Sequence, residues 1–142
     1  MDILFRSLLI FTAILTSVFF FLPYFDHMWL PYEQVLLLDR SGLGASIPNS
    51  NVIYWGTLIV WLLITFGLFF YYSLARVSFV VFYVIGFIAT LFHGAIVLAP
   101  YESLISSLIS LADGAILAIM YLTSIGDKFE INLGGKSIGE SI

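Results

Sequence analysis

The sequence predicts an all-α integral membrane protein in which four transmembrane helices form an up-down bundle. Hydrophobic residues make up 61% of the chain and charged residues only 10%, whereas soluble domains carry about 25% charged residues. The apolar residues also gather in stretches close to the roughly 20 residues that an α-helix needs to cross a bilayer. We expect these spans at about 4–23, 52–72, 77–99 and 103–125.

The connections between the spans leave no room for a separate soluble domain. Residues 1–125 are therefore predicted to form one transmembrane domain, and residues 126–142 a cytoplasmic tail. A net charge of −4 with only five Lys and Arg residues provides no basic surface for nucleic acid. The chain contains no cysteine, which excludes disulfides and thiolate metal sites.

The first span begins like a secretory signal peptide, because Arg6 precedes an apolar run. The run from Ser7 to Leu22 is longer than the apolar region of about 7–15 residues in a signal peptide. The residues from Pro23 to Asp26 also offer no cleavage site of small residues. We therefore expect this span to be retained as a membrane helix.

The few cations predict the orientation in the membrane. Arg6 precedes the first span, Arg76 lies between the second and third, and Lys128 and Lys136 follow the fourth. Arg40 alone lies on the other side of this topology. Because cytoplasmic loops carry an excess of Lys and Arg, both termini are expected in the cytoplasm, with Arg6, Arg76 and Lys128 as orientation anchors. The short connections favour a bacterial inner membrane.

The predicted outer loop, residues 24–51, contains one segment with helical character. Pro31 favours a helix start, the following residues continue the helix to Arg40, and Ser41 with Gly42 favours a helix end. The segment is too short to cross the membrane and is predicted to be an interfacial helix. The alternative is a docking surface for an external partner.

The third and fourth spans are predicted to form a tight hairpin. Small residues let helices approach closely in a membrane, and each span carries a row of them. The rows consist of Gly86, Thr90 and Gly94 on the third span and Ser103, Ser107, Ser110 and Gly114 on the fourth. Gly86, Gly94 and Gly114 are the predicted helix-packing positions, and His93 should meet the serines of the fourth span.

Asp113 is the residue that points most directly to a functional site. A carboxylate near the middle of a bilayer costs at least about 2.5–3.5 kcal/mol, so Asp113 should face the bundle interior, be protonated, or have a partner. We interpret it as a polar residue that fixes helix packing or contacts a partner helix. The alternative is a proton or cation site with His93 as a second titrating group. The candidate polar site comprises Asp113, His93, Ser107, Ser110 and Thr90.

No residue pattern indicates an enzyme. A serine nucleophile needs a base and a turn that presents its hydroxyl, and no Gly-x-Ser-x-Gly turn presents Ser106, Ser107 or Ser110. His27 and His93 stand on separate segments, unlike the closely spaced ligands of a metal cluster. We expect no catalytic residue, no metal and no cofactor.

Beyond the fourth span, Gly126 is expected to end the helix. The residues from Asp127 to Leu133 then alternate polar and apolar types. This pattern fits a strand added to a partner, a segment on the membrane surface, or a free tail. The three alternatives stay open.

Two classes of function agree with these observations. The first is a non-enzymatic protein that binds another membrane protein, or an inserting toxin, in the lipid bilayer. In size and topology the chain resembles the small polytopic immunity proteins that protect bacteria from membrane-targeting toxins. The second is a small transporter or channel with Asp113 and His93 as its proton or cation site. It would be a homo-oligomer, because four short helices enclose little pathway alone.

Overall fold

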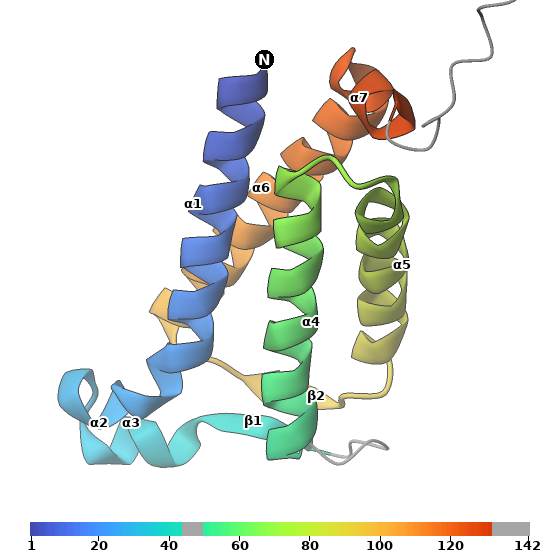
Figure 1. Ribbon diagram of the computed structural model, residues 1–142. Coiled ribbons are helices and arrows are strands. Elements are labelled where there is room, and N and C mark those ends of the chain that lie inside the picture. Colours follow the sequence, from blue (N-terminus) through green and yellow to red (C-terminus); the bar gives the residue numbers. More distant parts are fainter. Residues whose placement is uncertain (44–49, 132–142) are drawn as a thin grey trace, which may run out of the picture.

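A computed structural model describes residues 1–43 and 50–131 of the chain (Figure 1). In chain order the elements are α1 (Asp2–Phe21), the 3₁₀ helix η1 (Leu22–Tyr24), α2 (Asp26–Trp29), α3 (Tyr32–Leu37), β1 (Asp39–Leu43), α4 (Asn51–Phe69), α5 (Ser73–Thr90), β2 (Ala95–Val97), α6 (Pro100–Leu122) and α7 (Ile125–Ile131). The chain is mostly helical, as predicted. Four helices, α1, α4, α5 and α6, are long and apolar enough to cross a membrane.

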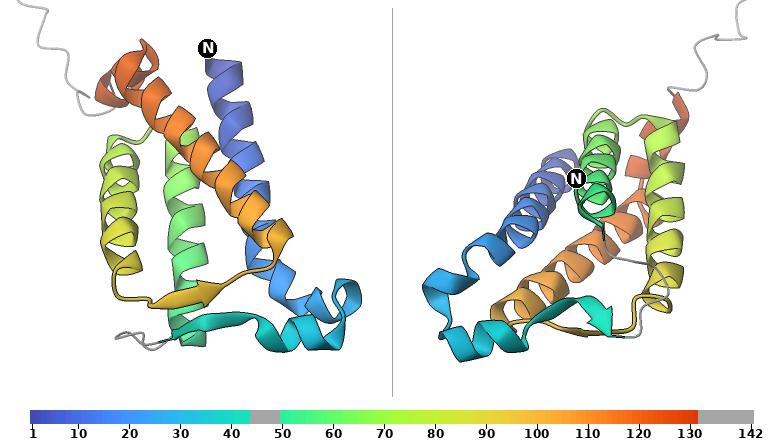
Figure 2. Two further views of the ribbon diagram at one scale, coloured as in Figure 1. Left: turned by 180° about the vertical axis from the view of Figure 1, so that it is seen from behind. Right: turned by 90° about the horizontal axis from the view of Figure 1, so that it is seen from below.

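The four long helices run in alternating directions (Figure 1). α1 and α5 begin at the end of the bundle where the N-terminus lies, and α4 and α6 begin at the opposite end. α6 crosses the bundle obliquely (Figure 2) and packs mainly against α1, while α4 packs mainly against α5. The predicted tight pairing of the third and fourth spans is therefore wrong. The extended connection between α5 and α6 carries the chain across the bundle before α6 begins.

The third long helix is shorter than predicted. α5 ends at Thr90, whereas the predicted span continued to Ala99. Gly94 has a positive φ of 69°, a conformation that suits glycine and turns the chain away from a helix. The next residues form β2, where the β-branched Ile96 and Val97 favour a strand.

A small antiparallel sheet joins the α3–α4 connection to the α5–α6 connection. β1 pairs with β2, with Asp39 opposite Val97 and Leu43 opposite Ala95. The sheet lies at the end of the bundle opposite the N-terminus (Figure 2, left). The predicted interfacial helix is correspondingly shorter, because α3 ends at Leu37 and the residues that follow pair in the sheet.

Local capping explains where α4 and α6 begin. Ser50 Oγ accepts a hydrogen bond of 3.3 Å from the backbone N–H of Ile53, as an N-cap residue does. α6 starts with Pro100, whose missing N–H would be unpaired at this position in any case. Glu102 is 1% exposed, and its Oε2 accepts a 2.8 Å hydrogen bond from the Ala99 N–H. This is the reciprocal half of a capping box.

The core lies in the half of the bundle nearest the N-terminus. Its buried side chains are Phe5, Leu9, Leu68, Tyr71, Ala75, Phe79, Ile116, Met120, Ile125 and Phe129. The rings of Phe5 and Tyr71 stack with their centres 5.8 Å apart, and Phe129 meets Tyr71 edge-on at 5.4 Å. The opposite half of the bundle holds a cavity lined by all four long helices.

The segment predicted to be a tail begins with a packed helix. α7 spans Ile125–Ile131, so Gly126 lies inside a helix instead of ending one. Ile125 and Phe129 share one face of α7 and are buried in the core. A strand or a free tail is therefore wrong for this part of the segment, and residues 132–142 lie outside the described residues.

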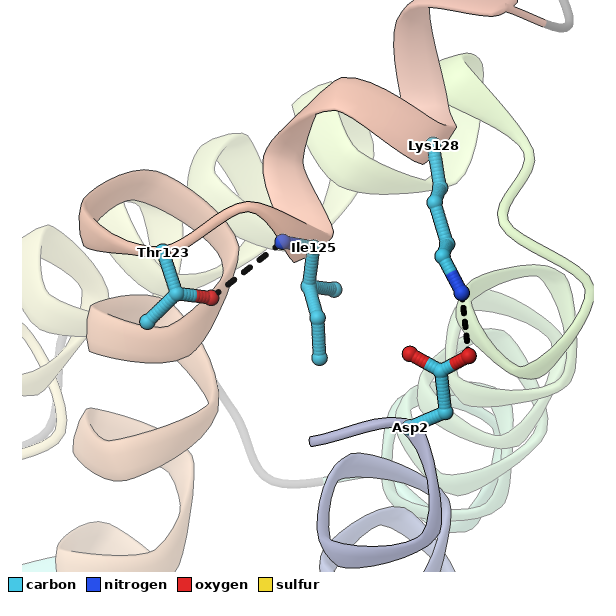
Figure 3. Close-up of polar contacts among 4 residues, drawn as sticks. All are labelled: Asp2, Thr123, Ile125 and Lys128. Atoms are coloured by element: carbon cyan, nitrogen blue, oxygen red, sulfur yellow. Dashed lines mark hydrogen bonds and ion pairs between the residues drawn. The ribbon is translucent and has the colours of Figure 1, made fainter.

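Polar contacts attach α7 to both α6 and α1 (Figure 3). Thr123 Oγ1 accepts a 3.3 Å hydrogen bond from the backbone N–H of Ile125. Lys128 forms an ion pair with Asp2 in the first turn of α1, and the two side chains are 42% and 48% exposed. An ion pair this exposed contributes little to stability, because water screens the two charges.

Candidate functional site

A cavity of about 380 Å³ lies between the four long helices, in the half of the bundle away from the core. Six aromatic side chains form much of its wall: Phe19, Phe20, Trp61, Phe82, Tyr83 and Phe87. Gly86, Thr90 and Ser110 also line the cavity, and all three are exposed. The cavity therefore opens between α5 and α6.

The helical spacing of α6 places Asp113 in this cavity. Ser106, Ile109, Ser110 and Asp113 all line it and recur at intervals of three or four residues, which is one face of a helix. The same face continues through Ile116 into the core. One side of α6 thus passes from the cavity into the packed half of the bundle.

Asp113 is the charged residue of the cavity. It is 0% exposed, and the hydroxyl of Tyr83 on α5 donates a hydrogen bond to its Oδ2. Oδ1 has no hydrogen-bond partner among the described residues. Because buried carboxylate oxygens nearly always accept hydrogen bonds, Oδ1 is an acceptor that the chain's described part leaves available.

Thr16 on α1 contributes a second buried oxygen to the cavity. The residue is 6% exposed, and within the described ranges its Oγ1 has no partner. Other hydroxyls of the wall bond to their own helix: Thr57 donates to the Ile53 carbonyl at 2.7 Å, and Ser110 to the Ser106 carbonyl at 3.0 Å. Such bonds are usual for Ser and Thr in helices. Among the described wall residues, the buried side-chain oxygens without a partner therefore belong to Thr16 and Asp113.

The structure brings together three residues of the predicted polar site. Asp113, Ser110 and Thr90 line one cavity. Ser107 is exposed and donates a 2.9 Å hydrogen bond to the Ser103 carbonyl. It is not among the described residues that line the cavity.

His93 lies apart from this group, and its predicted contact with the serines is wrong. It follows the end of α5, so helical geometry does not carry it toward α6. Its Nδ1 lies 2.7 Å from the Ala89 carbonyl oxygen. With Glu102 it lines a second cavity, of about 270 Å³. The two cavities share three wall residues: Phe19, Phe20 and Thr57.

The two predicted small-residue faces do not meet. A Cβ added at Gly86 or at Gly114 would meet nothing within 4 Å, and Gly94 lies in the turn after α5. Every member of the α6 row is exposed, namely Ser103, Ser107, Ser110 and Gly114. Within the described ranges, this face of α6 is therefore uncovered.

Sequence reasoning missed the aromatic part of the cavity wall. Tyr83 shares a helical face with Gly86 and Thr90, and that pattern indicates a side turned toward other helices. The aromatic residues of α1 and α4 carry no comparable signal, since aromatic residues are frequent throughout this chain. They could be found only from how the helices pack.

The predicted orientation anchors gather at the packed end of the bundle. The Arg6 guanidinium lies 5.0 Å from the centre of the Phe69 ring, and that of Arg76 lies 4.1 Å from the Tyr121 ring. Both are cation–π contacts. Lys128 pairs with α1, as described above. The three cations thus lie where the N-terminus, the start of α5 and α7 meet (Figure 1).

No protein-family model, curated protein or solved structure matches the chain. A functional assignment therefore rests on the geometry of the cavity and of the uncovered face of α6.

Proposed function

We propose that the chain is an integral membrane protein that acts without catalysis, by binding another protein within the bilayer. Only 11–22% of the most apolar window of each long helix is buried, while the mean hydropathies are 1.8–2.1. Proteins in water rarely expose apolar surface of this extent. Lipid is the environment in which such helices are stable.

The orientation follows from the cations. Arg6, Arg76 and Lys128 lie at one end of the bundle, and cationic ends stay in the cytoplasm. Both termini and α7 are therefore cytoplasmic in this proposal, and the sheet with α2 and α3 faces the outside. The short connections favour the inner membrane of a bacterium.

One observation carries the binding function: the small-residue face of α6 is uncovered. Its members are exposed from Ser103 to Gly114. The hydroxyls of Ser107 and Ser110 already donate to backbone carbonyls of α6, so a partner helix could approach without leaving these donors unsatisfied. Small residues at this spacing are typical of helix–helix contacts in membranes.

One form of this function agrees with the size and topology of the chain. An immunity-type protein would hold the transmembrane segment of a membrane-targeting toxin against α6. A toxin that acts by assembling in the bilayer is inactivated when that segment is occupied. The same face could also serve a resident membrane protein.

Site-specific photo-cross-linking tests the proposal. A photoreactive residue at Leu111, which is 73% exposed beside Ser107 on α6, should give an adduct with one foreign membrane protein in native membranes, identified by mass spectrometry. The same probe at Ile59 on α4, 57% exposed, is the control. Gly114→Phe should abolish the Leu111 adduct. Equal adducts at both positions would contradict the proposal.

A second function, transport by a homo-oligomer, is favoured by one specific observation. The two cavities share three wall residues, so together they extend from Asp113 toward the sheet end of the bundle. Under transport, Asp113→Asn abolishes flux in reconstituted vesicles while assembly stays intact. Under partner binding, the same variant keeps the adduct at Leu111, because the amide still forms hydrogen bonds.

A further inference from the structure

The cavity around Asp113 has the chemistry of a small-molecule site. Its volume of about 380 Å³ falls in the range of about 300–1,000 Å³ that ligand pockets occupy. Such pockets are mostly apolar and aromatic, with a few polar groups that fix orientation. Here six aromatic side chains surround the single formal charge among the described wall residues, which is Asp113.

The hydrogen bonds around Asp113 leave one of its two carboxylate oxygens without a hydrogen-bond donor. Tyr83 satisfies Oδ2, whereas Oδ1 has no partner in the described chain. The hydroxyls of Thr90 and Ser110 donate to backbone carbonyls at 2.6 Å and 3.0 Å. They are therefore not available to Oδ1. A molecule that enters the cavity can supply the donor that this oxygen lacks in the described chain.

The wall residues indicate that the bound molecule carries a positive charge and apolar groups. A buried carboxylate is stabilised by a cation, and aromatic faces attract cations. A bare metal ion such as Ca²⁺ needs about six to eight oxygen ligands. The aromatic wall supplies few oxygens, whereas an organic cation can cover it with apolar groups.

The geometry points to a binding site for a small hydrophobic ammonium compound of the arylalkylamine class. Its N–H group donates to Asp113 Oδ1, and its apolar body packs against Phe19, Trp61 and Phe87. Gly86 and Ser110 are exposed at the rim, so the ligand enters between α5 and α6. This site shares Ser110 with the α6 face proposed to bind a protein, whereas Asp113 belongs to the cavity alone and Gly114 to that face alone.

Equilibrium dialysis of tritiated 2-phenylethylamine against the purified full chain in detergent tests the site. We expect saturable binding at one site per chain. Asp113→Asn, which keeps hydrogen bonding and removes the charge, should weaken binding by at least about tenfold. The neutral analogue 2-phenylethanol should compete poorly, because it has the same shape without the cation.

Two glycine variants keep the test decisive even if Asp113→Asn does not fold. Gly86 lines the cavity and Gly114 does not, and a Cβ at either would meet nothing within 4 Å. Gly86→Phe should fill the cavity and abolish amine binding, while Gly114→Phe should leave it unchanged. Gly114→Phe conversely blocks the proposed protein partner, so the failure of one proposal is distinguishable from the failure of the other.

Four results would overturn the site. The first is that the wild type binds no more 2-phenylethylamine than empty micelles do, and the second is that 2-phenylethanol competes equally well. The third and fourth are undiminished binding of the amine to folded Asp113→Asn and to Gly86→Phe.

Discussion

The hydrogen bond between Tyr83 and Asp113 connects α5 to α6 across a cavity. α5 has few other contacts in this half, since its buried residues are Ala75 and Phe79 near its start. We predict that Tyr83→Phe destabilises the protein by about 1 kcal/mol. The reason is that hydrogen bonds between membrane helices average about 0.6 kcal/mol and reach about 1.7, and this one involves a carboxylate.

Unfolding by dodecyl sulfate in mixed micelles measures that loss. Tyr24→Phe is the control, because Tyr24 is 63% exposed. Equal stability of the two variants would show that the bond does not hold α5 in place.

The burial of Asp113 could be predicted from the sequence, but its partner could not. The cost of a carboxylate in a bilayer requires an inward position whatever the packing. The identity of the partner depends on which helices are neighbours. Asp113 meets Tyr83 and not His93 because α5 ends three residues before His93, and Gly94 marks that end only once its positive φ is known.

At the scale of elements, Gly67 on α4 lies in close contact with Ala75 on α5. A Cβ there would lie 2.7 Å from the Cβ of Ala75, which is attached directly to the backbone and cannot swing away. We predict that Gly67→Ala destabilises the protein by about 1–3 kcal/mol, since the helices would have to separate. Thermal unfolding in detergent is the measurement.

Gly56 on the same helix is the matched control. A Cβ at Gly56 meets nothing within 4 Å, so Gly56→Ala should be neutral or slightly stabilising because alanine favours helix. If Gly67→Ala proved as mild as Gly56→Ala, the close approach of the two helices would be wrong.

α7 is held by aromatic packing more than by its ion pair with α1. Phe129 is 0% exposed within the core, and replacing such a ring by alanine costs about 3–5 kcal/mol. The exposed pair of Lys128 and Asp2 contributes little, because water screens it. We predict that Phe129→Ala releases α7, measured as rapid amide hydrogen exchange in residues 125–131. Lys128→Ala should leave exchange nearly unchanged. A reversal of these two effects would assign the attachment to the ion pair.

The long helices were predictable as elements, and the short ones were not. Apolar length alone identifies a helix able to cross a membrane, which is why α1, α4 and α6 each end within three residues of the predicted limits. β2 and α7 have too few residues for a periodic pattern. β2 forms because β1 is present as a partner, and α7 forms because the core accepts Ile125 and Phe129.

At the scale of the whole molecule, the two halves of the bundle differ in how they are filled. α7 closes the end near the N-terminus, where all ten residues of the core lie. The other half contains the cavity, and there the sheet ties the connections together. This asymmetry gives rigidity to the end that carries the cations and leaves room for ligands at the other.

The same asymmetry predicts a fixed orientation across the membrane. The chain has no cysteine, so single cysteines report one position each. Leu36→Cys on α3, where Leu36 is 66% exposed, should react with a membrane-impermeant maleimide from outside intact cells. Glu130→Cys on α7, where the Glu130 side chain is 76% exposed, should react only after the membrane is opened. This outcome follows because four spans place α3 and α7 on opposite sides of the membrane, with the cations retained in the cytoplasm.

Labelling of both cysteines in intact cells would contradict the four-span topology. If Glu130→Cys reacted in intact cells and Leu36→Cys did not, the topology would hold but its orientation would be inverted.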